Sequence, residues 1–171
     1  MNQSEVQKEL ELFKKRVIQQ AKSNLTKMGK NSTGALHKGL KGDVTVFRTG
    51  NFALEFDLGK YGEFQDKGVS GKKKKYNTPF SYKSKMPPSK VFEQWVKNKG
   101  IKGRDKKGRF ITTKSLTFLI ARGIFNNGIK PSLFFTKPFE SAYKKLPEEL
   151  IEKYGIEAAK LFMDTIVQPK K

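Results

Sequence analysis

Cysteine is absent from this 171-residue chain, and histidine and tryptophan each occur once. Without cysteine the chain forms no disulfides and no thiolate metal sites, which is compatible with a reducing compartment. The single histidine, His37, leaves a histidine-based zinc site or a Ser/His/Asp relay without the residues it needs. His37 lies between Gly34 and Gly39 in a polar segment, which is more typical of a bystander than of a catalytic base. We therefore expect no enzyme activity and no cofactor.

Long apolar runs are also missing. No run approaches the roughly 18 residues that span a bilayer, and the N-terminal region carries Glu5, Glu9 and Glu11 where a signal peptide would be apolar. Neither export nor a membrane partner is expected. The chain still has 14 Phe and 5 Tyr residues, which supply enough large side chains for one modest core.

Acidic residues are scarce in one region. Residues 60–137 hold 20 of the 36 Lys and Arg residues but only four of the 16 Asp and Glu, so this region carries +16 of the net +20. A localised positive field indicates a polyanionic partner or a strongly charged neighbouring surface. The highest density of charge is the run of four lysines at 72–75. This run is either a loop that contacts phosphates or a solvated surface loop without a partner. The candidates for binding phosphate or an acidic partner are Lys72, Lys73, Lys74, Lys75, Lys83, Lys85, Arg104, Lys106, Lys107 and Arg109.

Aromatic residues alternate with these lysines at Tyr76, Phe80 and Tyr82. The pattern is compatible with bases stacking in a single-strand groove. The alternative is that the rings anchor a long loop to its own domain or to a neighbouring subunit.

Three acids near a predicted strand, Glu55, Asp57 and Glu63, loosely resemble the carboxylate group of a metal-dependent nuclease. Positions 55 and 57 share one face of a strand, and that face is most often the solvent face. A nuclease therefore ranks below the other functions considered.

Hydrophobic periodicity predicts the first elements of the fold. Apolar residues recur every three or four positions over 4–28, which predicts a long helix. Ser4 with Gln7 is the expected capping box, and Gly29 is the expected left-handed stop. Alternating residues then predict strands at 43–49 and 51–58, joined by a turn at Gly50-Asn51.

Further helices are expected near 88–100, from about 116 to Gly128, over 139–146 and after Pro147. Trp95 is expected to be a core anchor. The chain thus reads as α+β: a small antiparallel sheet packed against a long N-terminal helix, with further C-terminal helices. We expect a single domain over 1–171, with a basic extended arm at about 67–87.

Three segments carry a family resemblance in one order: TGAL at 33–36, KYGEFQDKG at 60–68 and RGIFNNGIKPSLFFTKPFESAY at 122–143. Together they resemble the tail-completion and head–tail joining proteins of tailed bacteriophages. The matching positions are Tyr61, Phe64, Asp66, Gly68, Ala121-Arg122, Gly128, Lys130-Pro131 and Phe135-Thr136-Lys137-Pro138.

The resemblance implies a non-enzymatic virion subunit, assembled in the host cytoplasm, that forms a ring at the phage neck. Its implied partners are copies of itself, the portal or connector protein, tail proteins and the genomic DNA that passes through. Leu133, Phe134 and Phe135 are nearly consecutive in an extended segment and are candidates for a subunit interface, with ordinary core packing as the equal alternative. The rival function is sequence-nonspecific DNA or RNA binding, in which the same bases contact phosphates directly.

Overall fold

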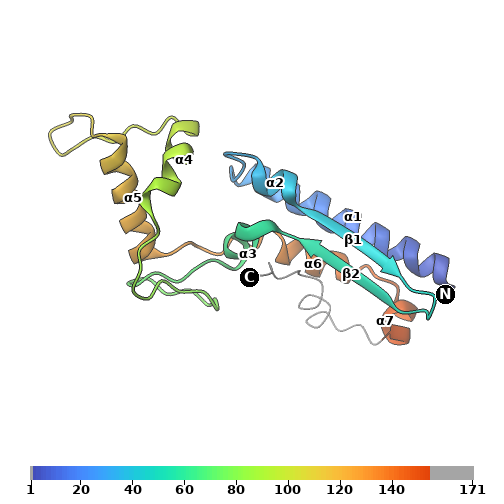
Figure 1. Cartoon of the computed structure of the whole chain (residues 1–171). Helices are drawn as coiled ribbons and strands as arrows, with labels where there is room; N and C mark the ends of the chain where they lie inside the picture. Colours follow the sequence, from blue (N-terminus) through green and yellow to red (C-terminus); the bar gives the residue numbers. More distant parts are fainter. Residues whose placement is uncertain (1, 155–171) are drawn as a thin grey trace. The chain divides into compact units, whose positions relative to one another are not determined.

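The protein is described here by a computed structural model, which places residues 2–154 (Figure 1). The chain divides into two compact units. The terminal unit is built from both ends of the chain, Met1–Gly62 and Leu133–Lys171, and the inserted unit is Glu63–Ser132. The segment 67–87, expected as an extended arm, lies within the inserted unit.

Helix α1, Gln3–Lys27, forms one wall of the terminal unit. Its N-cap is Asn2, whose side chain accepts a hydrogen bond from the Glu5 N–H at 2.9 Å while the Asn2 N–H donates to the Glu5 carboxylate at 2.7 Å. The capping box expected at Ser4 and Gln7 is wrong, because the Asn2 and Glu5 pair makes the same reciprocal bonds and starts the helix earlier. The predicted buried stripe is confirmed at Val6, Leu10, Phe13, Val17, Ala21 and Leu25.

The end of α1 is also confirmed, because Gly29 has φ +62 and takes the left-handed conformation that stops a helix. The connector that follows holds the short helix α2, Ala35–Gly39. Strands β1, Lys41–Val46, and β2, Phe52–Asp57, then pair antiparallel with Val44 opposite Leu54. Within residues 2–154 this sheet has only these two strands, so each strand has one edge without a strand partner.

Helices α6, Thr136–Tyr143, and α7, Glu148–Tyr154, complete the terminal unit. Its core is an aromatic cluster in which the rings of Phe13 and Phe139 lie 5.3 Å apart and those of Phe56 and Phe135 lie 5.1 Å apart, both edge to face. The predicted α+β class is confirmed: a small antiparallel sheet, a long N-terminal helix and further C-terminal helices. The later part of the predicted final helix, beyond residue 154, lies outside the described residues.

The inserted unit is mainly helical. Helix α3, Gly59–Lys67, leads into it, and η1, Ser89–Phe92, with α4, Glu93–Asn98, packs against the longer α5, Thr113–Asn127. The Thr112 hydroxyl caps α5 by accepting from the Ser115 N–H at 3.2 Å.

One expectation for the inserted unit is wrong. Trp95, expected to be a core anchor, is 38% exposed, because Val96 is the α4 residue that turns inward and is buried. On α5, Thr117 and Ala121 are buried, whereas Leu119 is 50% exposed.

The aromatic cluster generates a stability prediction. Phe56 has no exposed surface and contacts three other rings, so Phe56→Ala leaves a cavity and should lower the free energy of unfolding by about 3–5 kcal/mol. Phe47 is 48% exposed, and Phe47→Ala should cost less than about 1 kcal/mol. Urea unfolding followed by circular dichroism measures both. Equal losses in the two variants would contradict the placement of the core.

Candidate polyanion-binding surface

The two units differ sharply in charge. The inserted unit has 18 Lys and Arg residues and four acids, which give a net charge of +14. The terminal unit has 18 Lys and Arg residues and 12 acids, which give a net charge of +6. All of the inserted unit is described, and 17 of its 18 basic side chains are exposed while none of its four acids is. The surface of this unit is therefore strongly positive with little local compensation.

Three of the four acids of the inserted unit are paired or buried. Glu63 accepts from Lys67 at 2.9 Å one turn away on α3, and Asp66 is 1% exposed. Asp105 pairs with Arg109 at 2.9 Å. Because these carboxylates are turned toward their own unit, they do little to screen the exposed cations.

The lysine run is held in place by its backbone. The N–H of Lys72 donates to the Phe125 carbonyl at 2.9 Å, and those of Lys73 and Lys74 donate to the Asn126 carbonyl at 2.8 and 3.1 Å. Carbonyls in the last turn of a helix lack partners within the helix. The run, which we call the lysine loop (residues 72–75), thus caps the C-terminal end of α5, where the helix dipole favours positive charge. Its four side chains are exposed.

Glycines make this arrangement possible. A Cβ on Gly71 would lie 2.2 Å from the Asn126 carbonyl oxygen, and one on Gly128 would lie 2.1 Å from the Val69 oxygen. Val69 and Ile129 exchange two backbone hydrogen bonds at 2.9 and 2.8 Å across the same junction. Any residue other than glycine would push these backbones apart.

The aromatic residues near the lysine loop pack inside the inserted unit. The Phe80 ring lies 4.6 Å from that of Phe64, and the Tyr82 ring lies 6.3 Å from that of Phe125. For Phe80 and Tyr82, these contacts favour the alternative in which the rings anchor a long loop to its own domain. Lys83 and Lys85, farther along this segment, are exposed.

A second basic cluster lies at the other end of α5, in the turn that precedes it. Asp105 organises this turn by accepting from the N–H groups of Lys107 and Arg109, each at 2.9 Å. The Arg104 guanidinium lies 3.9 Å from the centre of the exposed Phe110 ring, a cation–π contact. Arg104, Lys106, Lys107 and Arg109 are all exposed here.

The ten candidate basic residues thus form two clusters along the sequence. The backbone of the lysine loop covers the C-terminal end of α5, with Lys83 and Lys85 farther along the same segment, and the Asp105 turn precedes the N-terminal end of the helix. Helix α5 has 15 residues and is about 22 Å long. A partner that contacts both clusters has to be an extended anionic surface or chain.

The candidate interface residues are placed differently. Phe134 and Phe135 are fully buried in the aromatic core, and Leu133 is half-buried with φ +51. Phe134 and Phe135 therefore belong to the core, which is the alternative to a subunit interface left open above. Exposed apolar side chains lie elsewhere, among them Phe118 and Leu119 of α5, which precede the exposed Arg122 by four and three residues. Their spacing of three and four residues is the signal in the sequence that marks a shared face.

Two of the carboxylates considered for a nuclease have other partners. Asp57 accepts from the Gly59 N–H at 2.7 Å and Glu63 pairs with Lys67 at 2.9 Å, while Glu55 lies opposite Asp43 in the sheet. Among the described residues no three His, Asp or Glu side chains are grouped to hold a metal ion. None of the helices between residues 2 and 154 combines the length and apolar character that crossing a membrane requires. Comparisons of the chain with protein-family models, curated proteins and solved structures find no match.

The close backbone approach at Gly71 and Gly128, which we call the glycine junction, predicts a local effect on the lysine loop. Gly71→Ala places a methyl group against backbone atoms and should cost about 1–3 kcal/mol. Backbone amides of the lysine loop should then exchange with deuterium faster. Gly123→Ala is the control, because nothing lies within 4 Å of its Cβ position and a helical alanine stabilises by up to about 1 kcal/mol. Unchanged exchange in the Gly71 variant would contradict the capping arrangement.

The Asp105 turn should depend on pH. The Arg109 N–H, aided by the Arg109 side chain and the Lys107 N–H, holds the pKa of the Asp105 carboxyl below its usual value. A lowered pKa means that the folded turn prefers the ionised carboxylate. The turn should therefore keep its geometry above pH about 4 and loosen as pH falls through the lowered pKa. Carbon-13 titration of the Asp105 carboxyl measures this, and Arg109→Ala should raise its pKa. A normal pKa in the wild-type chain would be inconsistent with the turn.

Proposed function

We propose that this chain is a structural virion subunit that forms a ring at the neck of a tailed phage and joins the portal or connector to the tail. One observation carries the proposal. The segments that resemble the tail-completion proteins, 60–68 and 122–143, meet in space, because Gly68 contacts Ile129 and Pro131 across the glycine junction.

This contact gives the shared motif a physical reason. A Cβ on Gly68 would lie 2.6 Å from both the Ile129 oxygen and the Pro131 nitrogen. The N–H of Ser132 donates to the Asp66 carbonyl at 3.0 Å, which fastens the same two segments again. Here the matching glycines, aspartate and proline belong to one interlocked structure.

A ring needs two different contact faces on each subunit. Counting residues 2–154, β1 and β2 each have one edge with no strand partner, which suits backbone pairing with another chain. The inserted unit exposes large apolar side chains, which suit the apolar centre of a protein interface. They include Val91, Trp95, Ile101, Phe110, Phe118 and Leu119.

The basic surface suits docking on acidic faces of adjacent rings or contact with DNA in the channel. Interactions between exposed charges are screened within about 8–10 Å at physiological salt. Assembly that uses this surface should therefore weaken as salt rises.

A second function, sequence-nonspecific nucleic-acid binding, is favoured by the 17 exposed bases and the lack of an exposed acid in the inserted unit. The same cations would then release counterions from phosphates, and affinity would fall steeply with salt.

Light scattering of the purified chain at low and high salt, with and without a short DNA duplex, separates the two functions. We expect a ring-sized species, or a monomer that DNA leaves unchanged. A monomer that binds the duplex tightly and loses it steeply with salt would replace the proposal with the second function.

The lysine loop should contribute to assembly. Changing Lys72, Lys73, Lys74 and Lys75 to Gln should weaken ring formation or partner docking at low salt. The control changes the exposed Lys8, Lys15, Lys27 and Lys38 of the terminal unit to Gln, with the same loss of charge. Equal assembly of the two variants and the wild-type chain would reject this role for the loop.

A further inference from the structure

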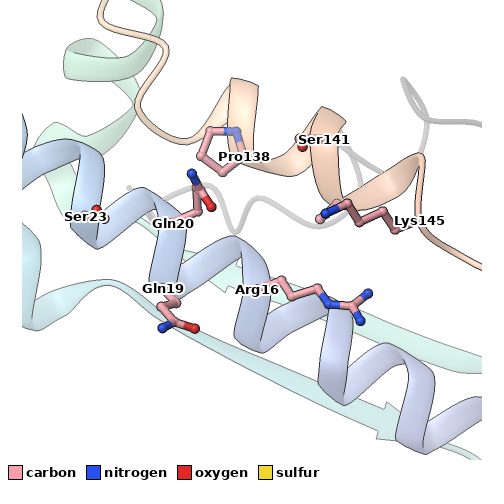
Figure 2. Close-up of a pocket in the computed structure, with 8 residues that line it drawn as sticks. Arg16, Gln19, Gln20, Ser23, Pro138, Ser141 and Lys145 are labelled. Atoms are coloured by element: carbon pink, nitrogen blue, oxygen red, sulfur yellow. The ribbon is translucent and has the colours of Figure 1, made fainter.

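A polar groove lies between α1 and α6 in the terminal unit, apart from the candidate basic residues of the inserted unit. Its volume is about 350 Å³. Figure 2 shows Arg16 and Lys145 toward one end of the groove and Gln20, Ser23 and Pro138 toward the other. The lining residues are Arg16, Gln19, Gln20, Ser23, Pro138, Ser141, Ala142 and Lys145.

The groove follows from how the two helices pack. Phe13 and Phe139 join α1 to α6 in the core, with ring centres 5.3 Å apart. Residues three, four and seven positions apart share a helix face. The polar residues from 16 to 23 therefore form a stripe beside the buried stripe of α1. The facing positions of α6 include Pro138 and Ala142, both buried and short, which leaves space between the helices.

The charge of the groove has one sign. Among the described residues, Arg16 and Lys145 are the two charged residues that line it, and no acid does. Neither side chain forms an ion pair or hydrogen bond with another described residue. Two amides, of Gln19 and Gln20, and two hydroxyls complete the polar lining. These groups donate and accept hydrogen bonds without adding charge.

We propose that this groove binds a carboxylate side chain of an acidic protein segment. The planar guanidinium of Arg16 can hold a carboxylate through two parallel hydrogen bonds. Lys145 adds a second positive charge from the opposite helix. The glutamine amides and the hydroxyls of Ser23 and Ser141 match the N–H and C=O groups of the peptide that carries the acid.

Size and charge favour a peptide over nucleic acid. A groove of about 350 Å³ admits a side chain with its backbone, whereas a duplex carries one charge per about 1.7 Å along its axis and needs an extended cationic surface. That surface is on the inserted unit, with net charge +14 against +6 for the terminal unit. The inference does not depend on the virion role, although neighbouring protein rings would supply such acidic segments.

Nitrogen-15 NMR of the full chain tests the proposal, because it localises binding and separates the groove from the basic inserted unit. The probe is acetyl-Glu-Glu-Glu-amide, with acetyl-Gln-Gln-Gln-amide as the neutral comparison. We expect saturable shifts of the Gln19 and Gln20 side-chain amides and of the Ser23 and Ser141 backbone amides with the acidic peptide alone.

Variants then assign the shifts to the groove. Arg16→Gln with Lys145→Gln should weaken peptide binding at these resonances about tenfold or more. Arg16→Lys should lose less, because it keeps the charge but not the bidentate geometry. The control, Lys15→Gln with Lys144→Gln, removes the same charge from adjacent exposed positions and should change affinity less than about twofold.

Several outcomes would overturn the proposal. These are shifts confined to the inserted unit, equal shifts with the neutral peptide, or an equal loss in the control variant. A titration with a short DNA duplex is the last test. If the duplex shifts the groove resonances, the Arg16 and Lys145 variant abolishes that effect, and the acidic peptide shifts none of them, the groove is a phosphate site instead. All three variants change exposed side chains, and unchanged spectra elsewhere verify the fold.

Discussion

The close backbone approach at Gly71 and Gly128 is the contact on which the inserted unit depends. It brings the start and the end of a 70-residue insertion together, so the entropy of closing this long loop is offset by packing and paired hydrogen bonds. The same approach gives the last carbonyls of α5 their donors, since the backbone of the lysine loop passes directly over them. With its ends joined in this way, the insertion lets α6 share a core with α1 although the two are far apart in sequence.

Stability and charge are divided between the units. The terminal unit holds the aromatic core, in which five of the largest fully buried side chains are phenylalanines. The inserted unit has fewer buried side chains and a net charge of +14, so its cations repel one another. An anionic partner would reduce this repulsion. The composition of the inserted unit is thus suited to binding, and that of the terminal unit to keeping a rigid scaffold.

The two proposed binding surfaces would recognise anions in different ways. The basic clusters of the inserted unit are exposed, and their attraction for an anionic partner would be screened by salt. The groove between α1 and α6 is small and includes a guanidinium with neutral hydrogen-bonding neighbours, so it would select by geometry. In the proposed virion role, the first surface would accelerate encounter and the second would set register.

The sequence by itself determined the elements whose signals are local. The buried stripe of α1, the alternation of β2 and the stops at Gly29 and Gly128 were predictable, because helix and strand periods and left-handed glycines act over a few residues. The basic character of residues 60–137 was likewise visible. Only the tertiary structure decided that Phe134 and Phe135 are buried while Trp95 is exposed, and that the lysine loop caps the C-terminal end of α5. These outcomes depend on partners far along the chain, such as Asn24, which bonds to the Phe134 carbonyl 110 residues away, and no local pattern encodes contacts of that range.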